Sequence, residues 1–86
     1  MRPVTIYTRP YCGYCSRALG LLEAKGAQIT EISMATQPDK RDEMIARSNG
    51  GRTFPQIFIG DTHVGGCDEL VALDRRGGLD PLLQGA

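Results

Sequence analysis

Two cysteines separated by two residues, Cys12 and Cys15, are the residues of this chain best suited to chemistry. They stand where a short apolar run gives way to helical periodicity, so Cys12 is expected at the amino terminus of a helix. Backbone N–H groups and the helix dipole stabilise a thiolate there, and a thiolate attacks disulfide sulfurs. Cys15 lies one turn further on, close enough to release the product. The pattern therefore predicts a redox dithiol in which Cys12 attacks and Cys15 resolves.

Two other uses of such a cysteine pair are less well supported. A zinc site would need a second cysteine pair or two histidines, and the chain offers only His63 and Cys67 in addition. A purely structural disulfide within one helix would constrain almost nothing, since the loop that it closes is so short. No metal ligand is therefore predicted.

Composition limits the remaining classes of function. The 86 residues are expected to form one domain, and ten Lys and Arg balance ten Asp and Glu. A chain without a basic block is not expected to bind nucleic acid. No segment is long enough to cross a bilayer, and the amino terminus lacks the apolar stretch of a signal peptide. The odd cysteine count favours a reducing compartment, so we expect a cytoplasmic protein with no membrane partner.

The elements that position the dithiol can be predicted from apolar periodicity. Residues 4–8 are β-branched, aromatic and apolar, which is typical of a buried strand. A helix with one buried face follows from Gly13, and Lys25-Gly26 supplies a cation and a glycine at its end. Residues 28–33 alternate and predict a second strand. Such a unit predicts a right-handed crossover between parallel strands.

A second helix is predicted after this crossover unit. The segment Thr36-Gln37-Pro38-Asp39 has the spacing of a capping box and would start the helix. The helix is expected to run to about residue 48, with Met44 and Ile45 as its apolar contacts.

A hairpin and a third helix complete the chain. Residues 56–64 contain a Gly-Asp pair between two strand-like runs, which is typical of a hairpin, with Phe58 and His63 as ordinary strand residues. A helix over residues 68–76 and a short turn near residues 80–83 follow. The order predicts an α/β domain with a thioredoxin-like fold, in which three main helices flank a four-stranded mixed sheet.

Four motifs occur in a particular order along the chain. They are Arg9, Cys12-Gly13-Tyr14-Cys15, Thr53-Phe54-Pro55 and Gly65-Gly66-Cys67-Asp68. In this order and spacing they resemble the dithiol glutaredoxins over essentially the whole chain. The resemblance implies an oxidoreductase that reduces protein disulfides and protein–glutathione mixed disulfides, with glutathione as reducing co-substrate, as a monomer. Thioredoxin proper fits less well, because the chain has no tryptophan.

The resemblance also implies a glutathione site. Arg9, assisted by Arg41, would bind the glycine carboxylate. Phe54 would pair through its backbone with the cysteinyl residue, beside a cis Pro55. The third helix would receive the γ-glutamyl carboxylate at its N–H groups, and Asp68 the ammonium. The expected glutathione-binding residues are Arg9, Cys12, Tyr14, Arg41, Thr53, Phe54, Pro55, Gly66, Cys67 and Asp68.

Ordinary alternatives remain for several of these residues. Arg9 and Arg41 can each be solvated surface charges, and Asp68 can be only a helix cap. Cys67 is expected to be a small residue near the ligand rather than a third redox thiol. Phe54 stands where the family more often has valine, so it is expected to narrow or reshape the groove.

A second function stays open beside the redox enzyme. In the family, a residue smaller than proline between the cysteines can accompany a [2Fe–2S] cluster that bridges two subunits with two glutathiones. Gly13 stands at that place here, and glycine would loosen the turn so that Cys12 can reach a cluster. A cluster-bridged dimer is thus the alternative, and the redox enzyme is the favoured interpretation.

Overall fold

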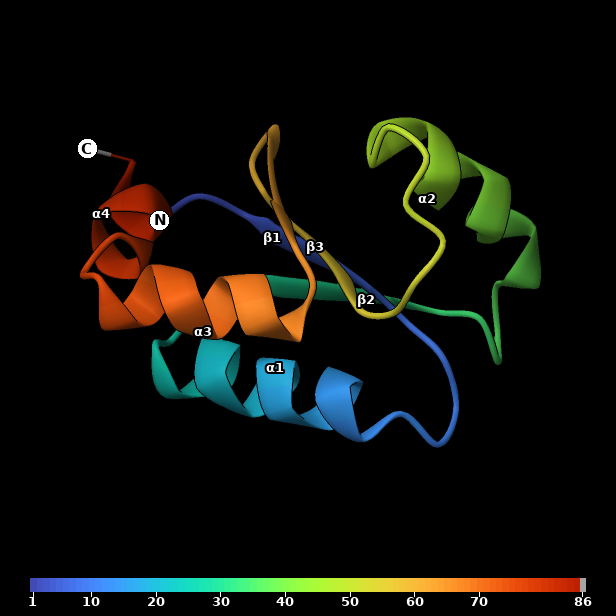
Figure 1. Cartoon of the computed structure of the whole chain (residues 1–86), viewed down its shortest axis with the longest axis horizontal. Helices are drawn as coiled ribbons and strands as arrows, with labels where there is room; N and C mark the ends of the chain where they lie inside the picture. Colours follow the sequence, from blue (N-terminus) through green and yellow to red (C-terminus); the bar gives the residue numbers. More distant parts are fainter. Residues whose placement is uncertain (86) are drawn as a thin grey trace.

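A four-stranded mixed sheet forms the centre of the molecule (Figure 1). The computed structural model describes residues 1–85. The strands are β1 (Val4–Thr8), β2 (Ile29–Ser33), β3 (Gln56–Ile59) and β4 (Thr62–Gly65), in the order β2-β1-β3-β4. β1 and β2 are parallel, whereas β3 is antiparallel to both of its neighbours. The predicted strands and their thioredoxin-like arrangement are confirmed.

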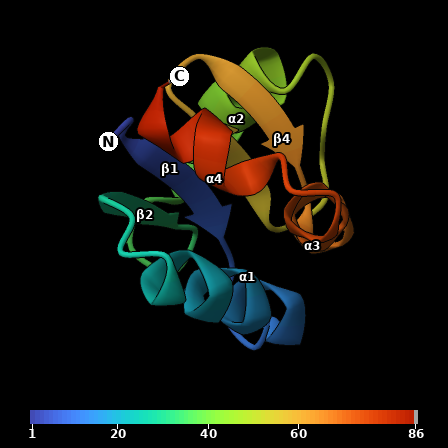
Figure 2. The same cartoon turned by 90° about the vertical axis from the view of Figure 1, so that its left-hand side faces the viewer.

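Helices cover both faces of this sheet. They are α1 (Gly13–Ala24), α2 (Arg41–Arg47), α3 (Cys67–Arg75) and α4 (Leu79–Gln84), with a 3-10 turn at Pro38–Lys40 before α2. α1 and α3 lie side by side on one face, and α2 lies on the other, as Figures 1 and 2 show. No helix of residues 1–85 is long and apolar enough to span a bilayer.

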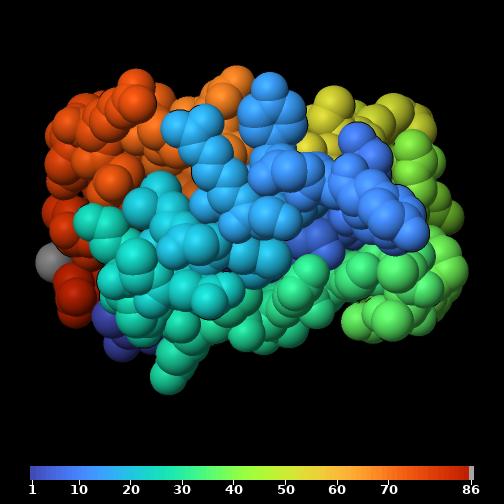
Figure 3. Space-filling view, turned by 90° about the horizontal axis from the view of Figure 1, so that it is seen from below, coloured from blue at the N-terminus to red at the C-terminus, as the bar shows by residue number. Residues whose placement is uncertain are grey.

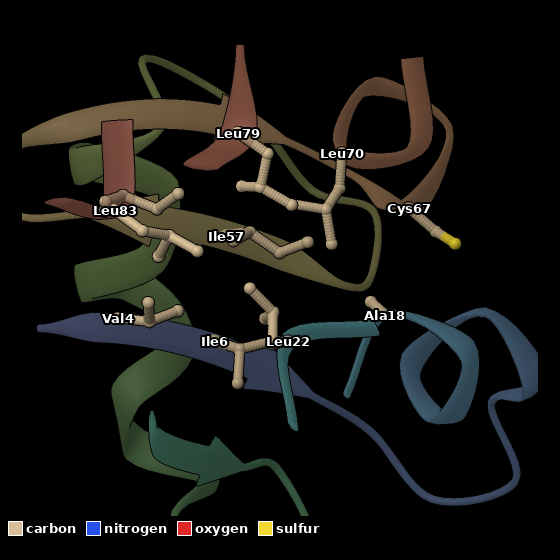
Figure 4. Packing of buried hydrophobic residues seen from close by; sticks show 10 residues of the cluster. Val4, Ile6, Ala18, Leu22, Ile57, Cys67, Leu70, Leu79 and Leu83 are labelled. Atoms are coloured by element: carbon tan, nitrogen blue, oxygen red, sulfur yellow. The ribbon is translucent and has the colours of Figure 1, made fainter. Parts of the chain in front are cut away.

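The sheet buries one apolar cluster on each face, because side chains alternate along a strand. Ile6 and Ile57 point towards α1 and α3, where they meet Leu22 and Leu70 (Figure 4). The smaller cluster, on the face of α2, consists of Tyr7, Met44 and Phe58. Both layers are thus fixed to the same two central strands, β1 and β3.

The start of the second helix differs from the prediction. The first turn caps at Gln37, so Thr36 lies one residue outside the capping position. The Thr36 hydroxyl instead donates to the Ser33 carbonyl at 3.4 Å. No side chain caps the 3-10 turn or α2, and the predicted capping box is therefore wrong.

The start of the third helix also differs. α3 begins at Cys67 and its N-cap is Gly66, whose N–H donates to the Glu69 carboxylate at 2.7 Å. Asp68 lies inside the first turn, so the alternative that it caps the helix is wrong. The Asp68 carboxylate therefore does not cap the start of α3.

Candidate functional site

Cys12 is the N-cap of α1. Its backbone is extended, with φ −113° and ψ 102°, and the Cys15 N–H points at its sulfur with 3.3 Å between N and Sγ. The sulfur thus occupies the place where a serine or aspartate oxygen caps other helices. A negative charge on this sulfur is stabilised by the N–H group and by the helix dipole.

A sharp turn delivers Cys12 to this position. β1 ends at Thr8, and Tyr11 adopts a positive φ of 56°, which is uncommon for a bulky residue. The Tyr11 side chain is fully exposed. Figure 3 shows this loop and the first residues of α1, in blue, at the surface of the molecule. A partner can therefore reach the start of α1 from solvent.

The two sulfurs of the dithiol have different surroundings. Cys12 is 9% exposed and Cys15 is 3% exposed. Burial, together with the hydrogen bond to the Cys12 sulfur, raises the pKa of Cys15 to about 12. Cys15 is therefore a protonated thiol at neutral pH, whereas the Cys12 sulfur lies nearer to solvent. This asymmetry suits an attacking Cys12 and a resolving Cys15.

A groove of about 160 Å³ lies next to Cys12. Seven of the ten predicted glutathione residues line it: Tyr14, Thr53, Phe54, Pro55, Gly66, Cys67 and Asp68. Glu69 completes the lining and was not predicted. The Phe54–Pro55 peptide bond is cis, and the Phe54 carbonyl oxygen lies 3.9 Å from the Cys12 sulfur. Segments from three parts of the chain thus meet at the nucleophile.

The structure does not bring Arg9 and Arg41 into the lining of this groove. Both side chains are exposed. Arg9 lies in the loop before Cys12, and Arg41 is the first residue of α2, which packs on the other face of the sheet. Their assignment to glutathione stays a prediction.

Cys67 is buried at the first position of α3. Burial raises the pKa of the Cys67 thiol. A buried, protonated thiol in the groove wall is a small apolar surface rather than a nucleophile. Residues 1–85 contain no group of three or more His, Cys, Asp or Glu side chains placed to hold a metal ion.

Gln56 supports the groove wall from behind, and it was not predicted from the sequence. It is 5% exposed, and its Nε2 donates to the Thr53 carbonyl at 3.1 Å and to the Thr53 hydroxyl at 3.2 Å. His63 Nε2 donates to the Gln56 amide oxygen at 2.8 Å, and its ring stacks on Phe58. The feature of the sequence that could have identified Gln56 is a polar residue directly after Pro55 in an otherwise apolar strand.

Comparisons with known proteins agree with this geometry. The family model "Glutaredoxin" matches residues 4–64. Glutaredoxin 3 of Escherichia coli is 55% identical over 84 residues, which cover 98% of this chain and all of that protein. A buckwheat glutaredoxin–glutathione complex is 36% identical, with a TM-score of 0.86 over 98% of this chain and 78% of that chain. A structure that concerns the metal binding of glutaredoxins is 57% identical, with a TM-score of 0.70 over 96% and 89% of the two chains.

Proposed function

Because the chain belongs to the glutaredoxin family and is a thiol–disulfide oxidoreductase, we propose that glutathione is its reductant and that it reduces both protein disulfides and protein–glutathione mixed disulfides. One observation carries the proposal. The Cys12 sulfur caps α1 beside a groove whose walls include Phe54, Pro55 and Asp68. The protein is proposed to act as a monomer in a reducing compartment, the cytoplasm.

Removal of glutathione from a target needs only Cys12. Its thiolate attacks the glutathione sulfur of the mixed disulfide, and the target leaves as a thiolate that takes up a proton. Glutathione is then bound to Cys12 through a disulfide. The thiolate of a second glutathione attacks the glutathione sulfur, oxidised glutathione leaves, and the Cys12 thiolate is restored. The mixed disulfide and one free glutathione are thus converted to the target thiol and oxidised glutathione, so one free glutathione is consumed per turnover.

Reduction of a protein disulfide needs Cys15 as well. Cys12 attacks one sulfur of the target, and the other sulfur leaves as a thiolate. Cys15 then loses its proton and attacks the Cys12 sulfur, which forms a Cys12–Cys15 disulfide and releases the second target thiolate. Two glutathiones reduce this disulfide and leave as oxidised glutathione.

Each polar group of the tripeptide has a proposed partner in or beside the groove. The Phe54 backbone is available for β-like pairing with the cysteinyl residue. The N–H groups at the start of α3 suit the γ-glutamyl carboxylate, and Asp68, which is exposed and does not cap the helix, suits the ammonium. Arg9 and Arg41 are proposed to reach the glycine carboxylate from outside the groove.

Turnover of a small glutathione mixed disulfide tests the proposal, with glutathione, glutathione reductase and NADPH as the regenerating system. Cys12→Ser is expected to reduce turnover to the uncatalysed background. Cys15→Ser is expected to keep this activity and to lose reduction of protein disulfides. The proposal is wrong if Cys12→Ser retains activity, or if glutathione does not sustain the wild-type reaction.

A second candidate function is a [2Fe–2S] cluster bound between two chains. A side chain at Gly13 would meet no atom within 4 Å, so the turn between the cysteines is open. One chain offers a single suitable sulfur, Cys12, because Cys15 is buried and protonated. The sulfurs of a second chain and of two glutathiones would have to complete the ligand set. The 57% identical structure that concerns metal binding supports testing this candidate.

Anaerobic reconstitution with iron, sulfide and glutathione tests the cluster. A cluster-bridged dimer would show visible absorption that co-elutes with protein at twice the monomer mass, and Cys12→Ser would abolish both. A colourless wild-type monomer after reconstitution would exclude this candidate.

A further inference from the structure

A second and larger groove lies between α1 and α3. Its volume is about 670 Å³, and the two helices that form it lie side by side (Figure 1). The lining residues are Arg17 from α1 and Asp68, Val71, Ala72, Arg75 and Arg76 from α3 and its carboxyl end. None of the reaction steps above uses this groove.

The larger groove adjoins the smaller groove beside Cys12. Asp68 lines both this groove and the smaller one beside Cys12. Arg17, from α1, lines the larger groove, and its positive charge opposes the rise in the pKa of the Cys67 thiol that burial causes. A substrate attacked at Cys12 can therefore extend into the larger groove.

Positive charge exceeds negative charge in the lining of this groove. The lining contains three arginines and one aspartate, and no ion pair within residues 1–85 includes these arginines. Neighbouring acidic residues are engaged elsewhere: Lys25 holds Asp74 at 2.9 Å and Asp80 at 3.0 Å. The net charge of the whole chain is zero, so positively charged side chains are concentrated on this face.

The length of the groove sets how far the charged groups of a bound segment lie from its reacting cysteine. Asp68 and Arg76 are eight residues apart along α3, or about 12 Å at the rise of an α-helix. An extended segment covers that distance in about four residues. Close to Cys12 the ligand would meet the negative charge of Asp68, and further along it would meet Arg75 and Arg76.

We propose that this groove binds an acidic segment of protein substrates, with carboxylates about three to five residues from the cysteine that Cys12 attacks. Arginine binds carboxylates in a forked geometry, and a cationic groove accelerates the encounter with an anionic partner. This inference rests on the proposed function, because it names a partner class for the same site.

Two synthetic peptides with the same disulfide test the proposal. One carries aspartates three to five residues from the cysteine, and the other carries asparagines at those positions. Reduced protein is mixed with each peptide, and the second-order rate of disulfide exchange is measured without glutathione. The aspartate peptide is expected to react about tenfold faster at low ionic strength, and this advantage should disappear at high salt.

Charge reversal locates the effect. Arg75→Glu is expected to lower the ratio of the aspartate-peptide rate to the asparagine-peptide rate about fivefold. Arg2→Glu makes the same charge change beside α4, outside the groove, and should leave the ratio unchanged. If the wild-type protein shows no preference for the aspartate peptide, or if Arg2→Glu lowers the ratio as much as Arg75→Glu, the proposal is wrong.

A third peptide separates this proposal from the proposed function. It carries the aspartates but has serines in place of cysteines, and its binding is measured by NMR shift changes of α1 and α3 amides. If the protein binds this peptide at the larger groove but reduces no disulfide, the proposed function is wrong and the proposal of an acidic-segment site is supported. If the protein reduces small disulfides but does not bind this peptide, only the proposal of an acidic-segment site is wrong.

Discussion

The difference between the two sulfurs is the central property of the site at the scale of single residues. Cys12 takes its place from the helix start, where the Cys15 N–H lies 3.3 Å from its sulfur. Cys15 takes its place from the helix interior, where burial keeps it protonated. One helical turn thus separates a sulfur that a substrate can reach from a sulfur that is buried and protonated.

The raised pKa of Cys15 predicts the pH dependence of the resolving step. Cys15 must be deprotonated to attack, and because burial raises the pKa of its thiol, the thiolate fraction should increase about tenfold per pH unit across the neutral range. Decay of the mixed disulfide between Cys12 and a protein target, followed by rapid quenching between pH 6.5 and 8.5, should accelerate accordingly. Cys15→Ser should leave the mixed disulfide intact at every pH. A resolving rate that does not change with pH would contradict the assignment.

The same pKa shift affects stability. The folded state favours the protonated thiol, whose pKa lies above the usual 9.0. Folding therefore gains stability from Cys15 below about pH 9, and this contribution is lost as the pH rises towards 12. The free energy of unfolding, measured by urea denaturation, should therefore fall less between about pH 9 and pH 11 in a Cys15→Ala variant than in the wild type.

At the scale of elements, the segment of residues 53–55 depends on a side chain behind it. Gln56 holds Thr53 by its carbonyl and its hydroxyl, and His63 holds Gln56. The chain of contacts runs from β4 to the groove wall. A positioning role for Gln56 follows, because nothing places its amide on the substrate itself.

Loss of the Gln56 amide should weaken substrate binding more than chemistry. In Gln56→Leu, the KM for a glutathione mixed disulfide is expected to rise roughly five- to tenfold, the effect of about one hydrogen bond. The rate of Cys12 alkylation should stay unchanged. Gln56→Glu also loses the donors to Thr53 and should behave alike, whereas Gln28→Leu, at an exposed position, should match the wild type. If Gln56→Leu lowers only the melting temperature, the amide is purely structural.

Much of the structure at the scale of elements could be predicted from the sequence. Strand and helix order, the position of Cys12 and seven lining residues follow from local periodicity and from the motifs that resemble the family. The predicted caps of the second and third helices are wrong, because a shift of one residue decides which side chain reaches a free N–H group. The contacts of Gln56 and the location of Arg41 depend on how distant segments pack, which local patterns do not encode.

Phe54 illustrates the same limit. The sequence predicts that its large side chain narrows the groove. In the structure Phe54 does line the groove, but its side chain also packs against the smaller cluster under α2. Part of its bulk is therefore directed away from the substrate.

At the scale of the whole molecule, one small core must hold every element of the site. β1 leads into the loop before Cys12, α1 presents the dithiol and α3 forms a groove wall, and all three share the larger cluster. Leu22 is fully buried between them. A domain of this size typically has about 5–15 kcal/mol of stability in total, so a single cavity has a large effect.

Leu22→Ala is expected to lower the free energy of unfolding by about 2–5 kcal/mol, through lost burial and the cavity that it leaves. Urea denaturation at pH 7 measures this change. Glu23→Ala, at the exposed neighbouring position, should change it by no more than about 0.5 kcal/mol. Equal values for the two variants would mean that the larger cluster is not tightly packed.

The most direct test of the account is to identify the sulfur that carries glutathione. Cys15→Ser protein, which cannot resolve the adduct, is reacted with a small glutathione mixed disulfide, digested and mapped by mass spectrometry. The account predicts one glutathione per chain, attached to Cys12 alone. Glutathione on Cys67, or no adduct at all, would contradict it.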